Sequence, residues 1–178
     1  MKSVRAQFWS FDIMFAIVVF MVAITILTYV WLTLSSQFSN SYTDGINLMQ
    51  SQLQGLGSGL LMPGSPSDWS SIVNLSDPTT WSNVSIGFGS GNGTLSYQKI
   101  MTFLAMSNSN YQDSKTPLGV GYDYYIIINS TGSNLVFGKN PSSHNAYSTQ
   151  VITEPVIVSG NPATLTIEIW TNTTFGIA

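Results

Sequence analysis

The side chains that could carry out acid–base or metal chemistry are few and scattered. The chain has one histidine, His144, and no cysteine, which excludes thiolate catalysis, disulfides and cysteine-bound metals. His144 lies in the sequence KNPSSHNAYS without the paired spacing of metal ligands, which favours a solvated loop residue. Asp68, Asp77, Asp113 and Asp123 could supply a carboxylate pair for glycoside hydrolysis. Asp68 and Asp77 precede Trp and Pro in turn-like sequence, so we interpret them as turn residues.

The glycine-rich run 87–93 (GFGSGNG) resembles a phosphate-binding loop only in its glycines. It lacks the lysine and the strand-to-helix context of such loops. Trp69, Trp81 and Phe88 are spaced through residues 57–95, a segment of turn and loop composition. We interpret them as anchors that hold the loops onto a core, with carbohydrate stacking as the alternative. We therefore expect no catalytic residue, no metal site and no cofactor.

Asp12 is the most informative ionisable residue, because it stands at the head of a long apolar stretch. Residues 13–34 supply 22 positions without a charged side chain, and a membrane span needs about 20 apolar residues. A charge at membrane depth costs about 2.5–3.5 kcal/mol on insertion scales. Two interpretations remain open from this residue alone. Asp12 either caps the start of the helix in the headgroup region or pairs with a cation in an assembly.

The uneven charge distribution predicts how the chain is oriented. Lys2 and Arg5 precede the apolar stretch, and the next basic residue is Lys99. The positive-inside rule therefore places the N-terminus in the cytoplasm and the part after Leu34 outside the cell. Charged residues make up 7% of the chain against about 25% in typical domains. The outer part has three bases and seven acids, a net charge of −4, which argues against a nucleic-acid partner.

Five Asn-x-Ser/Thr sequons lie in the predicted outer part, where N-glycosylation would act. They are candidate sites at Asn74, Asn83, Asn92, Asn129 and Asn172.

The apolar stretch is expected to continue as the amphipathic half of one helix. Large apolar residues recur at helical spacing beyond Leu34: Phe38, Tyr42, Ile46, Met49, Leu53 and Leu56. Three glycines and Pro63 then supply stop signals. A helix from about Ser10 to Leu56 would be roughly 70 Å long at 1.5 Å per residue. A break near Ser35 and Ser36 is the alternative.

The remainder is predicted to be a β-rich domain with one short helix. Residues 96–107 have a helical apolar face, and two strand pairs follow, 122–129 with 134–138 and 150–159 with 164–170. Alternation in the last strand indicates a sheet with one covered face, and Pro155 implies an edge position or a bulge. The predicted fold class is α+β, a long N-terminal hydrophobic helix followed by a small antiparallel β-sheet domain.

This order of elements resembles a type IV pilin, and the N-terminal residues carry the resemblance. Bacterial pilins are cut before a Phe with an acid at the fifth mature position, a spacing that Phe8 and Asp12 share. Gln7 departs from the Gly or Ala usual before that cut. Archaeal prepilins with class III signal peptides are cut after Gly or Ala and before Gln, which Ala6 and Gln7 match. Ser10 and Asp12 then each lie one place late. The chain looks more like the archaeal proteins, over about its first 30 residues.

The resemblance implies a function, a division of the chain and a set of partners. The parts are a leader peptide (1–7), a transmembrane or assembly half-helix (8–34), an amphipathic half-helix (35–57) and an extracellular globular β-rich domain (58–178). A prepilin-type peptidase would act at the site Ala6, Gln7 and Phe8, cutting before or after Gln7, and the chain would assemble with copies of itself or related pilins into an archaeal surface filament. Asp12 would pair with the free N-terminus of a neighbour. The rival is an uncleaved, signal-anchored monomer with a β-rich binding or adhesion domain.

Overall fold

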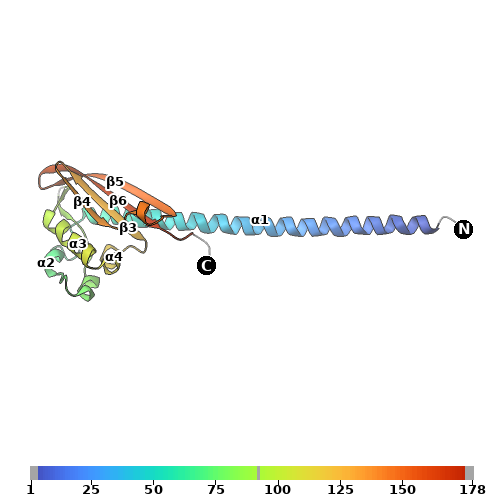
Figure 1. The fold of residues 1–178 in the computed structure, drawn as a ribbon, viewed down its shortest axis with the longest axis horizontal. Helices are drawn as coiled ribbons and strands as arrows, with labels where there is room; N and C mark the ends of the chain where they lie inside the picture. The colour runs from blue at the N-terminus through green and yellow to red at the C-terminus, as the bar shows by residue number, and fades with distance from the viewer. Residues whose placement is uncertain (1–3, 92, 175–178) are drawn as a thin grey trace. The chain divides into compact units, whose positions relative to one another are not determined.

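The computed structural model describes residues 4–91 and 93–174 of the 178-residue chain, with side chains from Phe11 onward (Figure 1). Contacts divide the chain into two units, Met1–Asp44 and Gly45–Ala178. The described part of the first unit is helical throughout. The second unit holds the end of that helix and an α+β domain with a mixed sheet.

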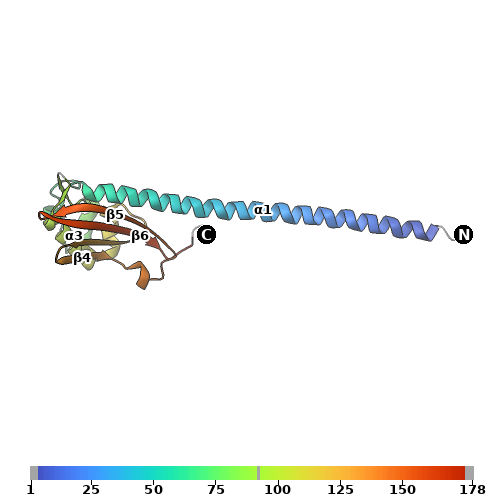
Figure 2. The same cartoon turned by 90° about the horizontal axis from the view of Figure 1, so that it is seen from above.

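Helix α1 spans Val4–Leu61 without a break, as the continuous hydrophobic pattern predicts, and no interruption occurs at Ser35. The helix ends five residues later than predicted, so its three glycines do not stop it. Gly57 instead lies against the sheet, where a Cβ atom would be in ordinary van der Waals contact with Ile152 Cδ1 at 3.6 Å. Figure 2 shows the end of α1 running alongside the strands of the sheet.

The elements after α1 alternate short helices with strands. They are α2 (Trp69–Ile72), η1 (Pro78–Asn83), β1 (Gly89–Gly91), β2 (Thr94–Leu95), α3 (Tyr97–Ser109), α4 (Tyr111–Leu118), β3 (Asp123–Ser130), β4 (Ser133–Gly138), η2 (Pro141–Ser143), β5 (Ser148–Val158) and β6 (Asn161–Thr171). Both predicted hairpins are confirmed, as is the short helix, whose N-cap Ser96 accepts a hydrogen bond from Lys99 N.

The strands form one sheet in the order β1-β2-β5-β6-β3-β4. The expectation of a purely antiparallel sheet is wrong, because β2 pairs with β5 in parallel at Thr94↔Ile157 and Leu95↔Val158. The strand β2 has only two residues, which is too short to produce a periodic sequence pattern. Pro155 belongs to the part of β5 that pairs with β6 but not with β2. This agrees with the predicted edge position.

The core lies between one face of the sheet and the helices. The aromatic anchors predicted in the loops are confirmed, since Trp69, Trp81 and Phe88 are fully buried. The indole Nε1 of Trp69 donates to Gly87 O at 2.9 Å and that of Trp81 to Asn74 O at 2.9 Å. Each tryptophan thus buries its ring and pairs its only polar atom with a loop carbonyl.

The predicted helical stripe contributes only its C-terminal half to this core. Met49, Leu53 and Leu56 are buried, together with Leu60, which lies beyond the predicted helix end. Two earlier members, Phe38 and Tyr42, are 60% and 44% exposed. The stripe therefore attaches the domain to α1 from Met49 onward, where Ser148 at the start of β5 reaches Met49 Sδ at 4.0 Å.

The sheet has one covered face, as the alternation in β6 predicts. Leu165, Ile167 and Ile169 are fully buried, and the residues between them face the other side. Trp170 departs from that pattern, because it lies on the outer side yet is only 1% exposed. The ring of His144 covers it at a centroid distance of 5.6 Å, and Trp170 Nε1 donates to Lys139 O at 2.9 Å.

Candidate functional site

The apolar segment of α1 is the feature of the molecule that most needs a partner. Eighteen large apolar side chains between Phe11 and Leu34 are 44–77% exposed. Removing such a side chain from water yields roughly 1.5–3 kcal/mol, so covering them all yields on the order of tens of kcal/mol. The helix is long and apolar enough to cross a membrane, and it can therefore serve as a membrane anchor.

The polar side chains of this segment are suited to an apolar environment. The hydroxyl of Thr25 donates to Met21 O at 2.8 Å, and that of Thr33 donates to Tyr29 O at 2.9 Å. In hydrocarbon, each unpaired polar group costs several kcal/mol. These two threonines satisfy their own hydroxyls within the helix, so they need neither water nor a partner chain.

Asp12 has no comparable arrangement. It is exposed, and none of the residues whose side chains are described forms an ion pair with it. The described helix begins at Val4, which places Asp12 more than two turns inside it. The helix dipole acts within the first turn, so capping does not account for the carboxylate in the uncut chain. The apolar segment thus carries one acid for which the described side chains supply no partner.

The three residues at the predicted cleavage site, Ala6, Gln7 and Phe8, lie outside the residues whose side chains are described. Their backbone belongs to α1.

The end of α1 is held by the glycine-rich run that resembles a phosphate loop. Phe88 N donates to Leu60 O at 2.7 Å, and Gly89 N donates to Met62 O at 2.8 Å. A Cβ atom on Gly87 would lie 2.2 Å from Met62 O. The carbonyls of the last helical turn thus find donors outside the helix, and the run is a docking segment for α1.

Lys99 closes the same junction from α3. Its Nζ donates to Pro63 O at 2.6 Å and to Gly89 O at 3.2 Å. Burial lowers the pKa of Lys99, and the charge of Asp68 opposes that shift. Sequence reasoning missed this role. The available signal was its isolation, because Lys99 is the only basic residue between Arg5 and Lys115.

A hydrogen-bonded cluster joins α4 to β3. Tyr111 Oη donates to Asp123 Oδ1 at 2.9 Å and accepts from Tyr124 N at 3.0 Å, while Lys115 Nζ pairs with Asp123 Oδ1 at 2.5 Å. Lys139 Nζ lies 4.7 Å from the centroid of the Tyr111 ring. Burial raises the pKa of Tyr111, so its hydroxyl stays protonated as the donor. The cluster is fully paired internally, which indicates a structural role.

The pH dependence of stability should report this cluster. Burial alone raises the pKa of Asp123, but hydrogen bonds from Lys115 and Tyr111 outweigh it and leave the pKa below its usual value. A carboxyl with a depressed folded-state pKa stabilises the fold above its unfolded pKa of about 4 and loses that contribution as pH falls further. Asp123→Asn should cost about 1.5–3 kcal/mol at pH 7 and much less at pH 2–3.

Urea unfolding of the full-length chain in detergent micelles at both pH values measures this difference. Asp113→Asn is the control, because Asp113 is exposed and its side chain bonds only to Asn110 nearby. A cost for Asp123→Asn that is the same at pH 7 and pH 2–3 contradicts the assignment.

The candidate sequons that the structure describes are accessible. Asn74, Asn83, Asn129 and Asn172 are all exposed, while Asn92 lies outside the described residues. Accessibility is necessary for glycosylation, so we predict glycans on these four asparagines in native material. Glycopeptide mass spectrometry checks this, and four unmodified peptides would refute it.

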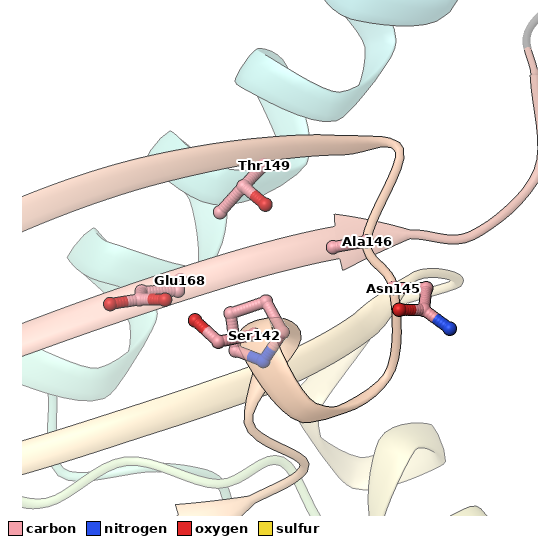
Figure 3. Close-up of a pocket in the computed structure, with 6 residues that line it drawn as sticks. Ser142, Asn145, Ala146, Thr149 and Glu168 are labelled. Atoms are coloured by element: carbon pink, nitrogen blue, oxygen red, sulfur yellow. The ribbon is translucent and has the colours of Figure 1, made fainter.

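Glu168 lies at an open depression of roughly 350 Å³ on the outer side of the sheet (Figure 3). Pro141, Ser142, Asn145, Ala146, Thr149 and Glu168 line it. Burial raises the pKa of Glu168, and it is the only ionisable side chain in the lining. His144 Nδ1 lies 2.9 Å from Asn140 O and is engaged within its own loop.

Asp68 and Asp77 occupy N-cap positions, as predicted for turn residues. Among described residues no three histidines or acids form a metal-binding group.

Comparisons with known proteins identify no relative. No protein-family model, no curated protein and no solved structure matches the chain.

Proposed function

We propose that this chain is a type IV pilin-like structural subunit of an archaeal surface filament, as a major or minor pilin. The observation that carries the proposal is that an exposed apolar helical segment bears a single carboxylate, Asp12. A lipid bilayer covers the apolar side chains but supplies no fixed cation for the carboxylate. A bundle of such helices covers the side chains and can also supply a cation.

In this proposal a prepilin-type peptidase removes the basic leader by cutting between Ala6 and Gln7 or between Gln7 and Phe8. Cleavage creates an α-amino group a few residues from Asp12. A buried charge without a partner is costly, whereas a paired one is tolerated. The carboxylate then selects the axial position of each incoming helix, because full insertion places Asp12 beside the amino terminus of a neighbour.

The domain after α1 forms the outer surface of the filament. Its low charge, its net negative balance and its exposed sequons support an extracellular location. The N-terminus is cytoplasmic before processing, by the positive-inside rule. Conversion of the anchored precursor into a filament subunit therefore needs no refolding of the domain.

Shearing of cells that express the full-length chain tests the proposal. The chain should appear in high-molecular-weight surface material that pellets on ultracentrifugation and shows filaments by electron microscopy. Recovery only from detergent extracts, as a monomer, would contradict it and favour the uncleaved signal-anchored protein with a binding or adhesion domain.

A further inference from the structure

The sheet of the domain has two open edges. On one side β4 pairs only with β3. On the other side β2 covers β5 only at Ile157 and Val158, so among the described strands none pairs with 148–156 on the side away from β6. Open edges present unpaired backbone donors and acceptors that template pairing with another chain.

Hydrogen bonds at the strand ends show which residues of β4 face outward. Lys139 N donates to Tyr124 O at 3.0 Å, so the backbone groups of Lys139 point toward β3. Backbone direction alternates along a regular antiparallel strand. The N–H and C=O groups of Asn134 and Val136 therefore point away from β3.

The same reasoning identifies the outward residues of β5. Ile157 N donates to Gly93 O at 3.4 Å on the β2 side. By alternation, Thr149, Val151 and Thr153 also direct their backbone groups to that side. Pro155 follows in the series and has no N–H, so strand pairing on this edge ends before it.

We infer that β4 of one copy of this chain pairs antiparallel with Thr149–Glu154 of β5 in a second copy. β4 runs antiparallel to β3, β3 to β6, and β6 to β5, so β4 and β5 run in opposite directions. Two copies placed side by side in the same orientation therefore present an antiparallel pair. The six residues of β4 match the six residues of β5 that precede Pro155.

This register joins residues of matching character. Val136 lies opposite Val151, Asn134 opposite Thr153, and Gly138 opposite Thr149. All of these side chains belong to the outer face of the sheet, so the pleat continues across the contact. Val136 and Val151 are 37% and 53% exposed in the single chain and would cover each other. A pair of apolar β-branched residues is a favourable cross-strand contact.

The pairing partner is a second copy of this chain, because the two open edges of the sheet are suited to pair with each other. The β4 sequence SNLVFG has no charge and no proline, which are the usual protections of an edge strand. The covered face also fits. Gly57 places α1 against β5 and β6, and Phe103 places α3 against β3 and β4. Across the new contact the α3 of one copy lies about two strand spacings, or roughly 10 Å, from the α1 of the next, which is a helix-packing distance.

The contact is head-to-tail, because it uses two different edges of each copy. Such contacts repeat into filaments rather than closing as dimers. The inference thus rests on the proposed function and deepens it, by naming the surfaces that join neighbouring outer domains.

Cysteine cross-linking tests the contact cleanly, because the chain has no cysteine of its own. The double variant Val136→Cys/Val151→Cys should form a ladder of disulfide-linked multimers in sheared surface material under mild oxidation. The Cα atoms of a directly hydrogen-bonded pair lie about 5.5 Å apart, within disulfide range. The matched control is Val136→Cys/Ile157→Cys. Ile157 is similarly exposed but lies six residues, about 20 Å, along the strand, and it should give no ladder.

The outcomes separate this inference from the proposed function. Filaments without a Val136–Val151 ladder would overturn the strand pairing and leave the filament proposal standing. A ladder in membranes that yield no filaments would support the pairing and contradict the filament. Dimers from Val136→Cys alone would show β4 pairing with itself and would overturn the inference.

Discussion

Replacing Asp12 with alanine is expected to lower recovery of the chain in sheared filaments tenfold or more, without changing the amount of the chain in membranes. The carboxylate costs about 2.5–3.5 kcal/mol at membrane depth, so its removal should favour insertion as a monomer. In an assembly the same removal leaves the amino terminus of a neighbour buried without a partner, at a cost of about 3–5 kcal/mol per subunit. The variant should therefore separate anchoring from assembly.

Two variants control for this effect. Asp12→Glu keeps the carboxylate and should retain a substantial part of assembly. Asp44→Ala removes an exposed acid from the same helix, beyond the apolar segment, and should assemble normally. Immunoblots of the pelleted and membrane fractions measure all three. Normal filament yield from Asp12→Ala would refute the pairing role and return Asp12 to the headgroup interpretation.

The second large effect is expected in the docking segment at the end of α1. Gly87→Ala should destabilise the domain by about 3 kcal/mol or more, at the upper end of single substitutions. The added Cβ would lie 2.2 Å from Met62 O and 2.4 Å from Gly64 N. Both contacts are with backbone, so no side chain can rotate away. Relief requires the run to leave the helix end, which breaks the bond from Phe88 N to Leu60 O.

Gly55→Ala is the matched control, because a Cβ atom there meets nothing within 4 Å. Alanine in a helix interior is favoured over glycine by about 0.5–1 kcal/mol, so this variant should be slightly more stable than the wild type. Urea unfolding of the full-length chain in detergent, followed by near-ultraviolet circular dichroism, measures both. Equal stability of Gly87→Ala and wild type would contradict the docking role.

The sequence predicted those parts of the fold that depend on periodic patterns. The helical stripe of α1, the apolar face of α3 and the alternation of β6 are repeated signals. The structure confirms the type of each of these elements, with boundaries displaced by a few residues. The aromatic anchors were also predictable, because a tryptophan in a glycine- and serine-rich loop has few ways to avoid water other than packing on the core.

The parts that the sequence did not predict depend on contacts between distant segments. The glycines of α1 looked like stop signals because their local effect on helices is known, whereas the contact of Gly57 with Ile152 depends on the sheet. The parallel β2–β5 pair involves two residues on each strand, too few to leave a pattern. By the alternation of β6, Trp170 falls on the uncovered face, yet the ring of His144 from a distant loop covers it. The docking role of Gly87 likewise appears only when the helix end and the loop are seen together.

The candidate site was likewise predictable only in part from the sequence. The apolar segment and Asp12 could be identified from residue types alone, since they express composition and charge. Lys99 could not be assigned a partner from the sequence, because its acceptors are backbone carbonyls of Pro63 and Gly89. Carbonyl acceptors have no sequence signature.

Mass spectrometry of the mature N-terminus tests the central claim most directly. The chain would be isolated from sheared surface material and from membranes of cells that express its full length. A mature chain that begins at Gln7 or Phe8 is the predicted result, because it places a free amino group within a few residues of Asp12. A chain that still carries Lys2 and Arg5 in every fraction would contradict prepilin-type processing and leave a membrane-anchored protein with an α+β domain.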